Sequence, residues 1–501
     1  MSTLSGIRVT YSGLISLMGG LVTIFTGIIF TLIITRSLAP HEYGTWGLIN
    51  GLMVYVIMIG SIVPYWVTRE TARGTESGKT AVISSGIFSM GGIVGYIIIA
   101  HFVGIQVHED QNLLLFAAVL IPVMFLNGTL SAINLGWKPQ AVAYGIASVG
   151  FTQIMIGLIF IYFLHMGVSG IILAVLIAQL TNSIILIIYA YDKIKNKIKK
   201  EYLIKWLKLS LISLYPGIAN TIAGLDVVIF TVITGSVVGL AFWSAALALP
   251  SMINQLGWIS KAVYPKLLER GNREYVEENL IHLFYFAIPL TGLVITFARA
   301  GLFALNPIYQ VAGLVSIFLA VHMFFNVING VFLSFLTGIE TVDANEKSVL
   351  KDYIKSKLFF LPTLRLIQYS VYIVLLSLGF LLLIKTTSQL NLLIFWSVIG
   401  LASEIPITIY LYVLLRRNFT LRLELKSILK YLLVSIVVFG MIYFLIGQLL
   451  DYKNDVFKFL HSVLLFAGLG MGSYLLVTYI VDLRTKKLFK AIVQEIKGKI
   501  F

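Results

Sequence analysis

The chain has 501 residues, of which 58% are hydrophobic and only 12% charged, with a mean hydropathy of +0.94. Soluble proteins carry about twice that charged fraction, so the composition excludes a soluble enzyme and a disordered chain and indicates a protein embedded in a lipid bilayer. The chain contains no cysteine, which excludes a disulfide scaffold, a thiolate nucleophile and a cysteine metal site. The meaning of its net charge of +15 depends on where the basic residues lie.

Fourteen apolar runs follow one another between polar breaks. Each is long enough to cross a bilayer, which needs roughly 20 mostly apolar residues. We therefore predict an all-α membrane protein of about 14 transmembrane helices. The predicted spans are 10–35, 44–67, 80–106, 113–135, 141–165, 170–191, 209–235, 240–263, 280–303, 311–337, 364–384, 390–415, 430–450 and 457–481.

The basic residues are divided unevenly between the two sides of the predicted bundle. With a cytoplasmic N-terminus, the cytoplasmic segments hold 32 of the 37 Lys and Arg. Because Lys and Arg concentrate in cytoplasmic loops, this division predicts a multi-pass protein of the cell membrane with both termini in the cytoplasm. The positive charge is then a topological signal, and no nucleic-acid partner is expected.

Two basic cytoplasmic segments have the pattern of a helix lying in the membrane interface, with apolar residues at every fourth position among lysines. In the segment 192–208 these residues are Ile194, Ile198, Tyr202 and Trp206. In the C-terminal tail they are Leu488, Ile492, Ile496 and Ile500. We interpret both segments as anchors on anionic membrane lipids, with a specific partner protein as the alternative.

Spans one to six are predicted to be duplicated as spans seven to twelve. The stretch from Gly44 to Gly74 is echoed from Gly239 to Gly271, at offsets of 195 and 197 residues. In spans four and ten, the pair Asn127-Gly128 is echoed by Asn329-Gly330. An even number of spans keeps both copies in one orientation, which gives two lobes with a substrate cavity between them. The predicted parts are an N-lobe (1–191), a basic amphipathic linker (192–208), a C-lobe (209–415), two extra spans (416–481) and a basic cytoplasmic tail (482–501).

Two carboxylates lie within predicted spans, Asp226 in span seven and Glu404 in span twelve. A charged side chain at membrane depth is unfavourable and is retained mainly for function, so both are candidates for ion coupling or gating. Desolvation favours the protonated form of a carboxylate, which suits a proton site, and a carboxylate can equally hold a cation. An internal ion pair or a hydrogen bond between helices is the alternative.

Four arginines near span ends are candidate ligands for a phosphorylated substrate: Arg36, Arg69, Arg73 and Arg299. The guanidinium matches the geometry of a phosphate and keeps its charge, although snorkelling toward the interface explains the same positions. Polar side chains within spans either line a cavity or bond neighbouring helices. These are Asn127, Asn134, Gln179, Asn182, His322 and Asn326. From these arginines and polar residues we select six as the substrate-binding candidates: Arg36, Arg69, Asn127, Arg299, His322 and Asn326.

No Walker-like, metalloprotease or catalytic-triad signature occurs in the sequence, and its seven histidines are scattered. We therefore expect no enzymatic activity, no cofactor and no bound catalytic metal.

The segment 35–44, which reads TRSLAPHEYG, resembles the R-x-L-x-P-x-x-Y/F-G signature of polysaccharide biosynthesis transporters. Asp226, the stretch from Gly235 to Gly239 and the run to Tyr264-Pro265 are similar to the seventh and eighth spans of that family. Leu302-Phe303, Tyr309 and the apolar run into Gly338 resemble its ninth and tenth spans. The resemblance extends over most of residues 1–415.

That family belongs to the multidrug/oligosaccharidyl-lipid/polysaccharide exporter (MOP) superfamily. The resemblance implies a flippase that moves a polyprenyl-diphosphate-linked oligosaccharide from the cytoplasmic to the outer leaflet by alternating access, coupled to H⁺ or Na⁺ or to neither. In the lipid II flippases of the superfamily, an extra pair of spans forms a groove for the lipid tail. A cation-coupled multidrug antiporter is the alternative, and a membrane-embedded glycosyltransferase or polymerase is disfavoured by the short outer loops.

Overall fold

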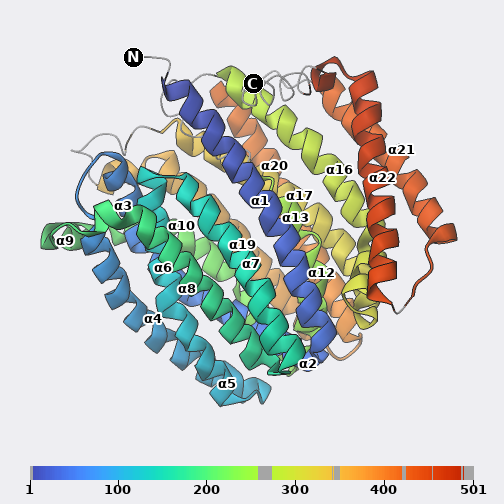
Figure 1. The fold of residues 1–501 in the computed structure, drawn as a ribbon, viewed down its shortest axis with the longest axis horizontal. Helices are drawn as coiled ribbons and strands as arrows, with labels where there is room; N and C mark the ends of the chain where they lie inside the picture. The colour runs from blue at the N-terminus through green and yellow to red at the C-terminus, as the bar shows by residue number, and fades with distance from the viewer. Residues whose placement is uncertain are drawn as a thin grey trace.

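The structure is a computed structural model that describes residues 4–257, 273–340, 342, 350–419, 425–453, 455–486 and 489. These residues are almost entirely helical and contain no β-strand, which confirms the predicted all-α class. Figure 1 shows long helices packed side by side, with the start of α1 (Leu4–Ser37) and the end of α22 (Val456–Val481) at the same end of the bundle. We call this end the termini end and the opposite one the far end.

The first half of the chain forms six long helical segments, two of which have clear breaks. Its helices are α1, α2 (Pro40–Ile57), α3 (Ile62–Ala72), α4 (Gly78–Val107), α5 (Gln111–Phe116), α6 (Leu120–Trp137), α7 (Gln140–Gly157) and α8 (Gly167–Ile194), with short turns η1 (Ile59–Ser61), η2 (Ala117–Val119) and the π-helical η3 (Leu158–Phe163). The axes of α2 and α3 differ by 47°. Pro64 explains this bend, because it has no amide hydrogen for the carbonyl one turn earlier.

The second half repeats this pattern of long and broken helices. Its helices are α10 (Ser210–Ala223), α11 (Leu225–Thr234), α12 (Val238–Ala248), α13 (Ser251–Asn254), α16 (Arg273–Leu305), η4 (Pro307–Ala312), α17 (Gly313–Gly338), α18 (Leu350–Ile354), α19 (Lys357–Leu383) and α20 (Gln389–Phe419). The helix α21 (Leu425–Leu449) and α22 follow. Gly235, at φ +62°, ends α11 in the left-handed conformation that glycine adopts without strain.

The number of spans in the described residues is eleven, or twelve when the bent pair α2 and α3 counts as one. The predicted count of about 14 is therefore not established. The first and eighth predicted spans correspond to shorter apolar helices, Val22–Ser37 and Val238–Ala248. In the eighth, α12 ends just before Pro250, which cannot continue the hydrogen-bonding pattern of a helix. The rest of that predicted span, from residue 258, lies outside the described residues.

Helix packing in the second half follows the order of the first. The contact of α1 with α7 in the first half corresponds to that of α10 with α19 in the second. In the same way, the contact of α4 with α6 corresponds to that of α16 with α17, and the contact of α6 with α8 to that of α17 with α20. A matching cap begins the fourth helical segment of each half: Asp110 accepts a hydrogen bond from the Asn112 amide, and Asn306 accepts one from the Ile308 amide. This order is the one that a duplicated six-helix unit would produce.

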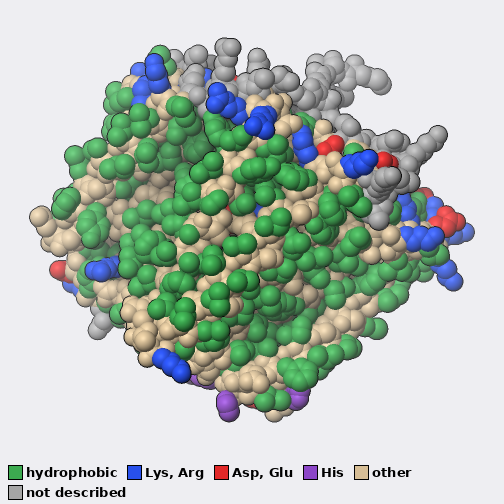
Figure 2. All heavy atoms as spheres, turned by 180° about the vertical axis from the view of Figure 1, so that it is seen from behind, with side chains coloured by type: hydrophobic (Ala, Val, Ile, Leu, Met, Phe, Trp, Pro, Cys, Tyr) green, Lys and Arg blue, Asp and Glu red, His purple; other side chains and the backbone are tan. Residues whose placement is uncertain are grey.

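The surface of the bundle is largely apolar. On α4, for example, exposed residues recur every three or four positions, as expected of a helix that faces lipid: Ile87, Met90, Val94, Ile98 and Phe102. Figure 2 shows Lys and Arg gathered mainly along the upper rim, with hydrophobic side chains over the wide band below it. These features indicate a multi-span membrane protein with its basic residues concentrated at the termini end.

The basic linker contains the short helix α9 (Lys200–Lys208). Three residues of the predicted membrane-facing stripe, Ile194, Tyr202 and Trp206, instead pack within the protein. Trp206 Nε1 donates a hydrogen bond of 3.3 Å to Glu70 Oε1, and Lys205 Nζ lies 3.3 Å from the same oxygen. The prediction that these three residues face the membrane is therefore wrong, because spacing alone does not distinguish a protein contact from a lipid contact. The similar stripe from Leu488 to Ile500 lies, apart from Phe489, outside the described residues.

Candidate substrate and ion site

A buried ion pair joins two helices of the second half. Glu404 lies midway along α20 and is completely buried. Arg365 Nη1 on α19 donates to both of its carboxylate oxygens, at 2.9 and 3.1 Å. Asn329 Nδ2 on α17 donates to Glu404 Oε2 at 2.6 Å. Because a buried carboxylate is stable only when its charge is compensated, these two donors account for its place in the bundle.

Two further side chains complete what we call the C-half charge cluster, defined as Arg365, Glu404, Asn329, His322 and Gln368. His322 Nε2 lies 3.9 Å from Glu404 Oε1. Gln368 Oε1 accepts a 2.7 Å hydrogen bond from Arg365 Nη1, and Gln368 Nε2 donates to the Ser403 carbonyl at 3.1 Å. Three helices thus meet at one guanidinium and one carboxylate.

Asp226 belongs to a separate hydrogen-bonded group of aromatic residues. Its Oδ2 accepts from the Tyr372 hydroxyl at 2.9 Å and from Trp396 Nε1 at 3.2 Å. Its Oδ1 accepts from the Val227 amide at 2.7 Å, at the start of α11. Trp396 in turn stacks on Trp243, with ring centroids 3.8 Å apart. The carboxylate therefore links the seventh span to the eleventh and twelfth through donors on both of those spans.

Gly400 separates this aromatic group from the C-half charge cluster. A Cβ atom at Gly400 would lie 3.3 Å from His322 Nδ1 and 4.0 Å from Tyr372 Cε2. The two groups are therefore adjacent, with His322 of the one and Tyr372 of the other on either side of Gly400. The two carboxylates predicted for ion coupling, Asp226 and Glu404, contribute to a single polar region of the second half.

The predicted ligand Asn127 and the polar span residue Asn134 lie elsewhere and are engaged in packing. Asn127 Nδ2 donates to the Gln179 carbonyl and to Gln179 Oε1, both at 2.8 Å, and Asn127 Oδ1 accepts from Ser183 at 2.7 Å. Asn134 Nδ2 donates to the carbonyls of Leu130 and Leu186. These contacts join α6 to α8, which is the alternative considered for polar residues within spans.

Arg36 holds the end of another helix. Its guanidinium donates to the Phe303 carbonyl at 3.0 Å and to the Ala304 carbonyl at 2.8 and 3.2 Å. These carbonyls end α16, where a cation is favourable because the last carbonyls of a helix lack partners within the helix. Asn306 Nδ2 also donates to the Thr35 carbonyl, at 2.7 Å. The first and ninth spans are therefore tied together at the far end.

The remaining candidates are not gathered at one place. The Arg69 guanidinium lies over the Tyr65 ring at 4.0 Å, and Arg299 is exposed beside Gly313. Asn326 lies one turn after His322 on α17 and is partly exposed. Of the six predicted ligands, only His322 and Asn326 thus share a helix with a residue of the charge cluster. Among the described residues, no group of three His, Asp or Glu side chains could hold a metal ion.

Arg365 is the main residue of this site that the sequence analysis missed. The predicted span eleven begins at residue 364, so hydropathy places Arg365 at the cytoplasmic end of that span, among the 32 basic residues expected on that side. In the structure α19 begins at Lys357, which places Arg365 roughly two turns inside the helix. The sequence feature that indicates a buried Arg365 is an arginine at the start of an apolar run with a second polar residue, Gln368, one turn later.

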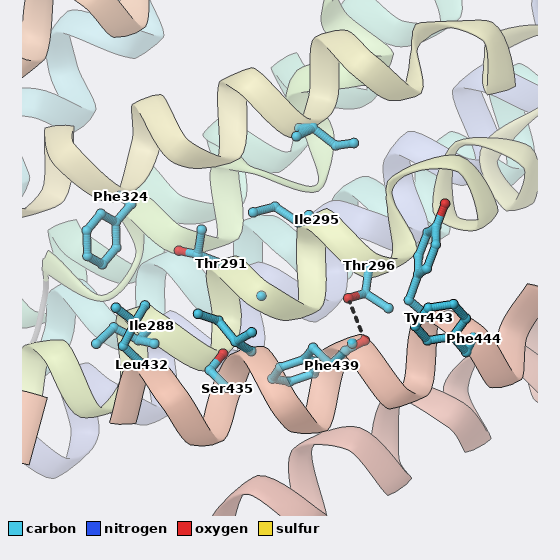
Figure 3. Close-up of a pocket in the computed structure, with 14 residues that line it drawn as sticks. Ile288, Thr291, Ile295, Thr296, Phe324, Leu432, Ser435, Phe439, Tyr443 and Phe444 are labelled. Atoms are coloured by element: carbon cyan, nitrogen blue, oxygen red, sulfur yellow. Dashed lines mark hydrogen bonds between the residues drawn. The ribbon is translucent and has the colours of Figure 1, made fainter. Parts of the chain in front are cut away.

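A separate apolar cavity of about 550 Å³ lies between α16, α17 and α21. Figure 3 shows its walls, with Ile288, Thr291 and Ile295 facing Leu432, Ser435 and Phe439. Thr296 donates to the Phe439 carbonyl at 3.4 Å, so α16 and α21 meet at this point. Several lining residues are also strongly exposed, with Ile436 at 61% and Phe444 at 73%. The cavity is therefore a groove in the lipid-facing surface.

Comparison with solved structures identifies the fold. No family model matches the chain, and no curated protein matches it in sequence. The lipid II flippase MurJ, in an inward closed conformation, aligns with a TM-score of 0.61 and 14% identity over 94% of this chain and 98% of the flippase. The chain has the fold of the MATE transporters and MurJ.

Two MATE structures define the second group of neighbours. An inward-facing multidrug resistance MATE family transporter of the MOP superfamily aligns with a TM-score of 0.57 and 14% identity, over 81% of this chain and 98% of that transporter. An outward-facing one aligns with a TM-score of 0.53 and 16% identity, over 82% of this chain and 95% of that transporter. At these identities the likeness concerns the fold. The resemblance to polysaccharide biosynthesis transporters remains a prediction.

Proposed function

We propose that this protein flips a polyprenyl-diphosphate-linked oligosaccharide from the cytoplasmic to the outer leaflet of the cell membrane by alternating access. In this proposal the termini end, where basic residues gather, is cytoplasmic. A glycan and a diphosphate are too polar to cross hydrocarbon and need a polar path between the two halves, whereas the polyprenyl tail can remain in lipid. The flipped oligosaccharide would then be used in the assembly of cell-surface polysaccharide or glycan.

The observation that carries this proposal is the apolar groove between α16, α17 and α21. Its lining is almost entirely hydrophobic, and it opens on the lipid-facing surface, as a site for a prenyl chain requires. The flippase alignment covers 94% of this chain, whereas the MATE alignment covers 81%. The longer alignment is consistent with a lipid-linked substrate, and the groove lined in part by α21 is the feature of this chain that would hold its tail.

Asp226 is our candidate for the gating or coupling carboxylate. It links three spans, and it is held by neutral donors rather than by a basic side chain. A bound H⁺ or Na⁺ would alter those hydrogen bonds and shift the balance between inward-facing and outward-facing states. The hydrogen bonds of Arg36 at the far end would hold that side closed in the present conformation.

The groove can be tested with two variants on one helix. Ile436 and Leu433 both lie on α21 and are 61% and 54% exposed, but only Ile436 lines the groove. Ile436→Trp should slow the flipping of a fluorescent polyprenyl-diphosphate glycan in reconstituted vesicles by about tenfold, because the indole fills the space for the prenyl chain. Leu433→Trp should flip it at the wild-type rate. Equal rates for both variants would remove the groove from the mechanism.

A cation-coupled multidrug antiporter is the second candidate function. The specific observation in its favour is the group formed by Asp226, Tyr372, Trp396 and Trp243, because a carboxylate among aromatic rings suits an amphipathic cation. Ethidium efflux by the reconstituted protein distinguishes the two. The antiporter would export ethidium in exchange for a cation and leave the glycan lipid unmoved.

A further inference from the structure

Arg365 uses only part of its hydrogen-bonding capacity. Within the described residues, all of its hydrogen bonds come from Nη1, which donates to Gln368 and to both oxygens of Glu404. Nε and Nη2 donate no hydrogen bond to any residue that the structure describes. An arginine that pairs fully with a carboxylate normally uses two nitrogens in parallel. Here one nitrogen serves the whole carboxylate, and the other two remain available.

The guanidinium is nevertheless held firmly in place. The Arg365 side chain is only 10% exposed, and Glu404 and Gln368 are both buried. His322, whose side chain is 20% exposed and whose Nδ1 has no partner in the described residues, lies next to the same carboxylate. A fixed arginine with two unused donors near a partly exposed histidine is an arrangement suited to an oxyanion.

We propose that Arg365 binds a phosphate or diphosphate oxyanion of the substrate through Nε and Nη2, while Nη1 remains on Glu404. This deepens the proposed function, on which the choice of a lipid-linked diphosphate as ligand rests. Glu404 and Gln368 act as positioning residues that orient the fork. His322, whose Nε2 lies 3.9 Å from Glu404 Oε1, offers a further donor beside the pair. This site lies in the second half of the bundle and is distinct from the apolar groove.

Glu404 also sets the strength of this site. The negative charge of Glu404 offsets the positive charge of Arg365, so the pair is close to neutral and binds an anion weakly. Replacing it with glutamine retains an acceptor for Nη1 and removes the opposing charge. The structure therefore predicts that Glu404→Gln binds an oxyanion more tightly than the wild-type protein, on the order of tenfold.

The test uses the purified full chain in detergent with inorganic pyrophosphate as the probe, measured by titration calorimetry. Wild type should bind weakly, Glu404→Gln about tenfold more tightly, and Arg365→Lys more weakly than wild type because lysine lacks the fork. The double variant Arg365→Gln with Glu404→Gln contains no buried charge at the pair and should fold but not bind. Arg416→Gln, at an exposed arginine of α20, is the matched control and should bind as wild type does.

Binding by the folded double variant with the affinity of Glu404→Gln would overturn the proposal. A parallel titration with polyprenyl diphosphate in mixed micelles identifies the source of the oxyanion. Tighter, Arg365-dependent binding of the lipid indicates a lipid headgroup, and equal affinities indicate free phosphate. Arg365-dependent binding of pyrophosphate by a protein that fails to flip the glycan lipid would contradict the proposed function and leave the oxyanion site intact.

Discussion

The same helix contact is neutral in the first half of the molecule and charged in the second. On α6, Asn127 is bonded to Gln179 and Ser183 of α8. On α17, Asn329 is bonded to Glu404 of α20. Both asparagines precede a glycine, and both helix pairs occupy the same position in the packing order. The repeated Asn-Gly pair therefore makes a neutral contact in the first half and a contact with a charged residue in the second.

The difference shows that two halves with the same packing order can hold contacts of different chemistry. Neutral amides satisfy one another and fix the distance between helices, with a modest contribution from each hydrogen bond. A buried carboxylate and guanidinium depend on each other for charge compensation, and a change in either one alters the electrostatics of the surrounding helices. We therefore assign packing to the Asn127 contact and propose that the C-half charge cluster contacts the substrate.

The largest effect should follow loss of one partner of the ion pair. Glu404→Leu leaves Arg365 buried without a counter-charge, and such changes cost about 3–5 kcal/mol. Adding Arg365→Met should recover most of that loss, because a neutral apolar pair replaces the ion pair. Chemical unfolding in detergent provides the measurement. Equal stability of the single and double variants would show that the two side chains are not coupled.

Arg36→Ala should have the next largest effect. It removes charge-assisted hydrogen bonds to two carbonyls at the end of α16, worth about 2 kcal/mol together. We expect the far end to open more often and export of the lipid-linked glycan to fall. Arg36→Lys should export more than Arg36→Ala but less than the wild type, because lysine lacks the planar fork of a guanidinium. Cysteine pairs across α1 and α16, introduced into this cysteine-free chain, would report the opening by cross-linking. Unchanged export and cross-linking would reduce Arg36 to an interface anchor.

Asp226→Asn should separate function from folding. The amide oxygen can still accept hydrogen bonds from Tyr372 and Trp396, but the bond from the Val227 amide is lost, so stability should fall by about 1 kcal/mol. Flipping driven by an imposed pH or Na⁺ gradient should fall about tenfold, because the ionisable group is gone. A variant that responds to the gradient as the wild type does would leave Asp226 with a structural role only.

Asn127→Ala should have the smallest effect on transport. It breaks neutral hydrogen bonds between α6 and α8 and should destabilise the protein by about 1 kcal/mol. Vesicle flipping assays should show no change in transport rate or in the response to a gradient. A loss of transport comparable with that of Asp226→Asn would abolish the proposed difference between the two halves.

The helical class, most spans and the Asn-Gly echo could be predicted because hydrophobic runs and repeated spacings are local patterns. The partners of the site residues could not. Arg36 bonds carbonyls some 267 residues further along the chain, and Asp226 meets Trp396 through tertiary packing. The burial of Arg365 could not be predicted because hydropathy locates the apolar core of a span and not its first residue. Trp206 was assigned to the lipid because an amphipathic stripe does not specify what covers it.

The central claim is that the C-half charge cluster handles the substrate and its neutral counterpart does not. The most direct measurement is the flipping rate of a fluorescent polyprenyl-diphosphate glycan in vesicles for the wild type, Asn127→Ala, and the neutral pair variant Arg365→Gln with Glu404→Gln. We predict that Asn127→Ala flips the glycan at the wild-type rate and that the neutral pair variant flips it about tenfold more slowly, at comparable amounts of folded protein. A neutral pair variant that flips the glycan at the wild-type rate would contradict the claim.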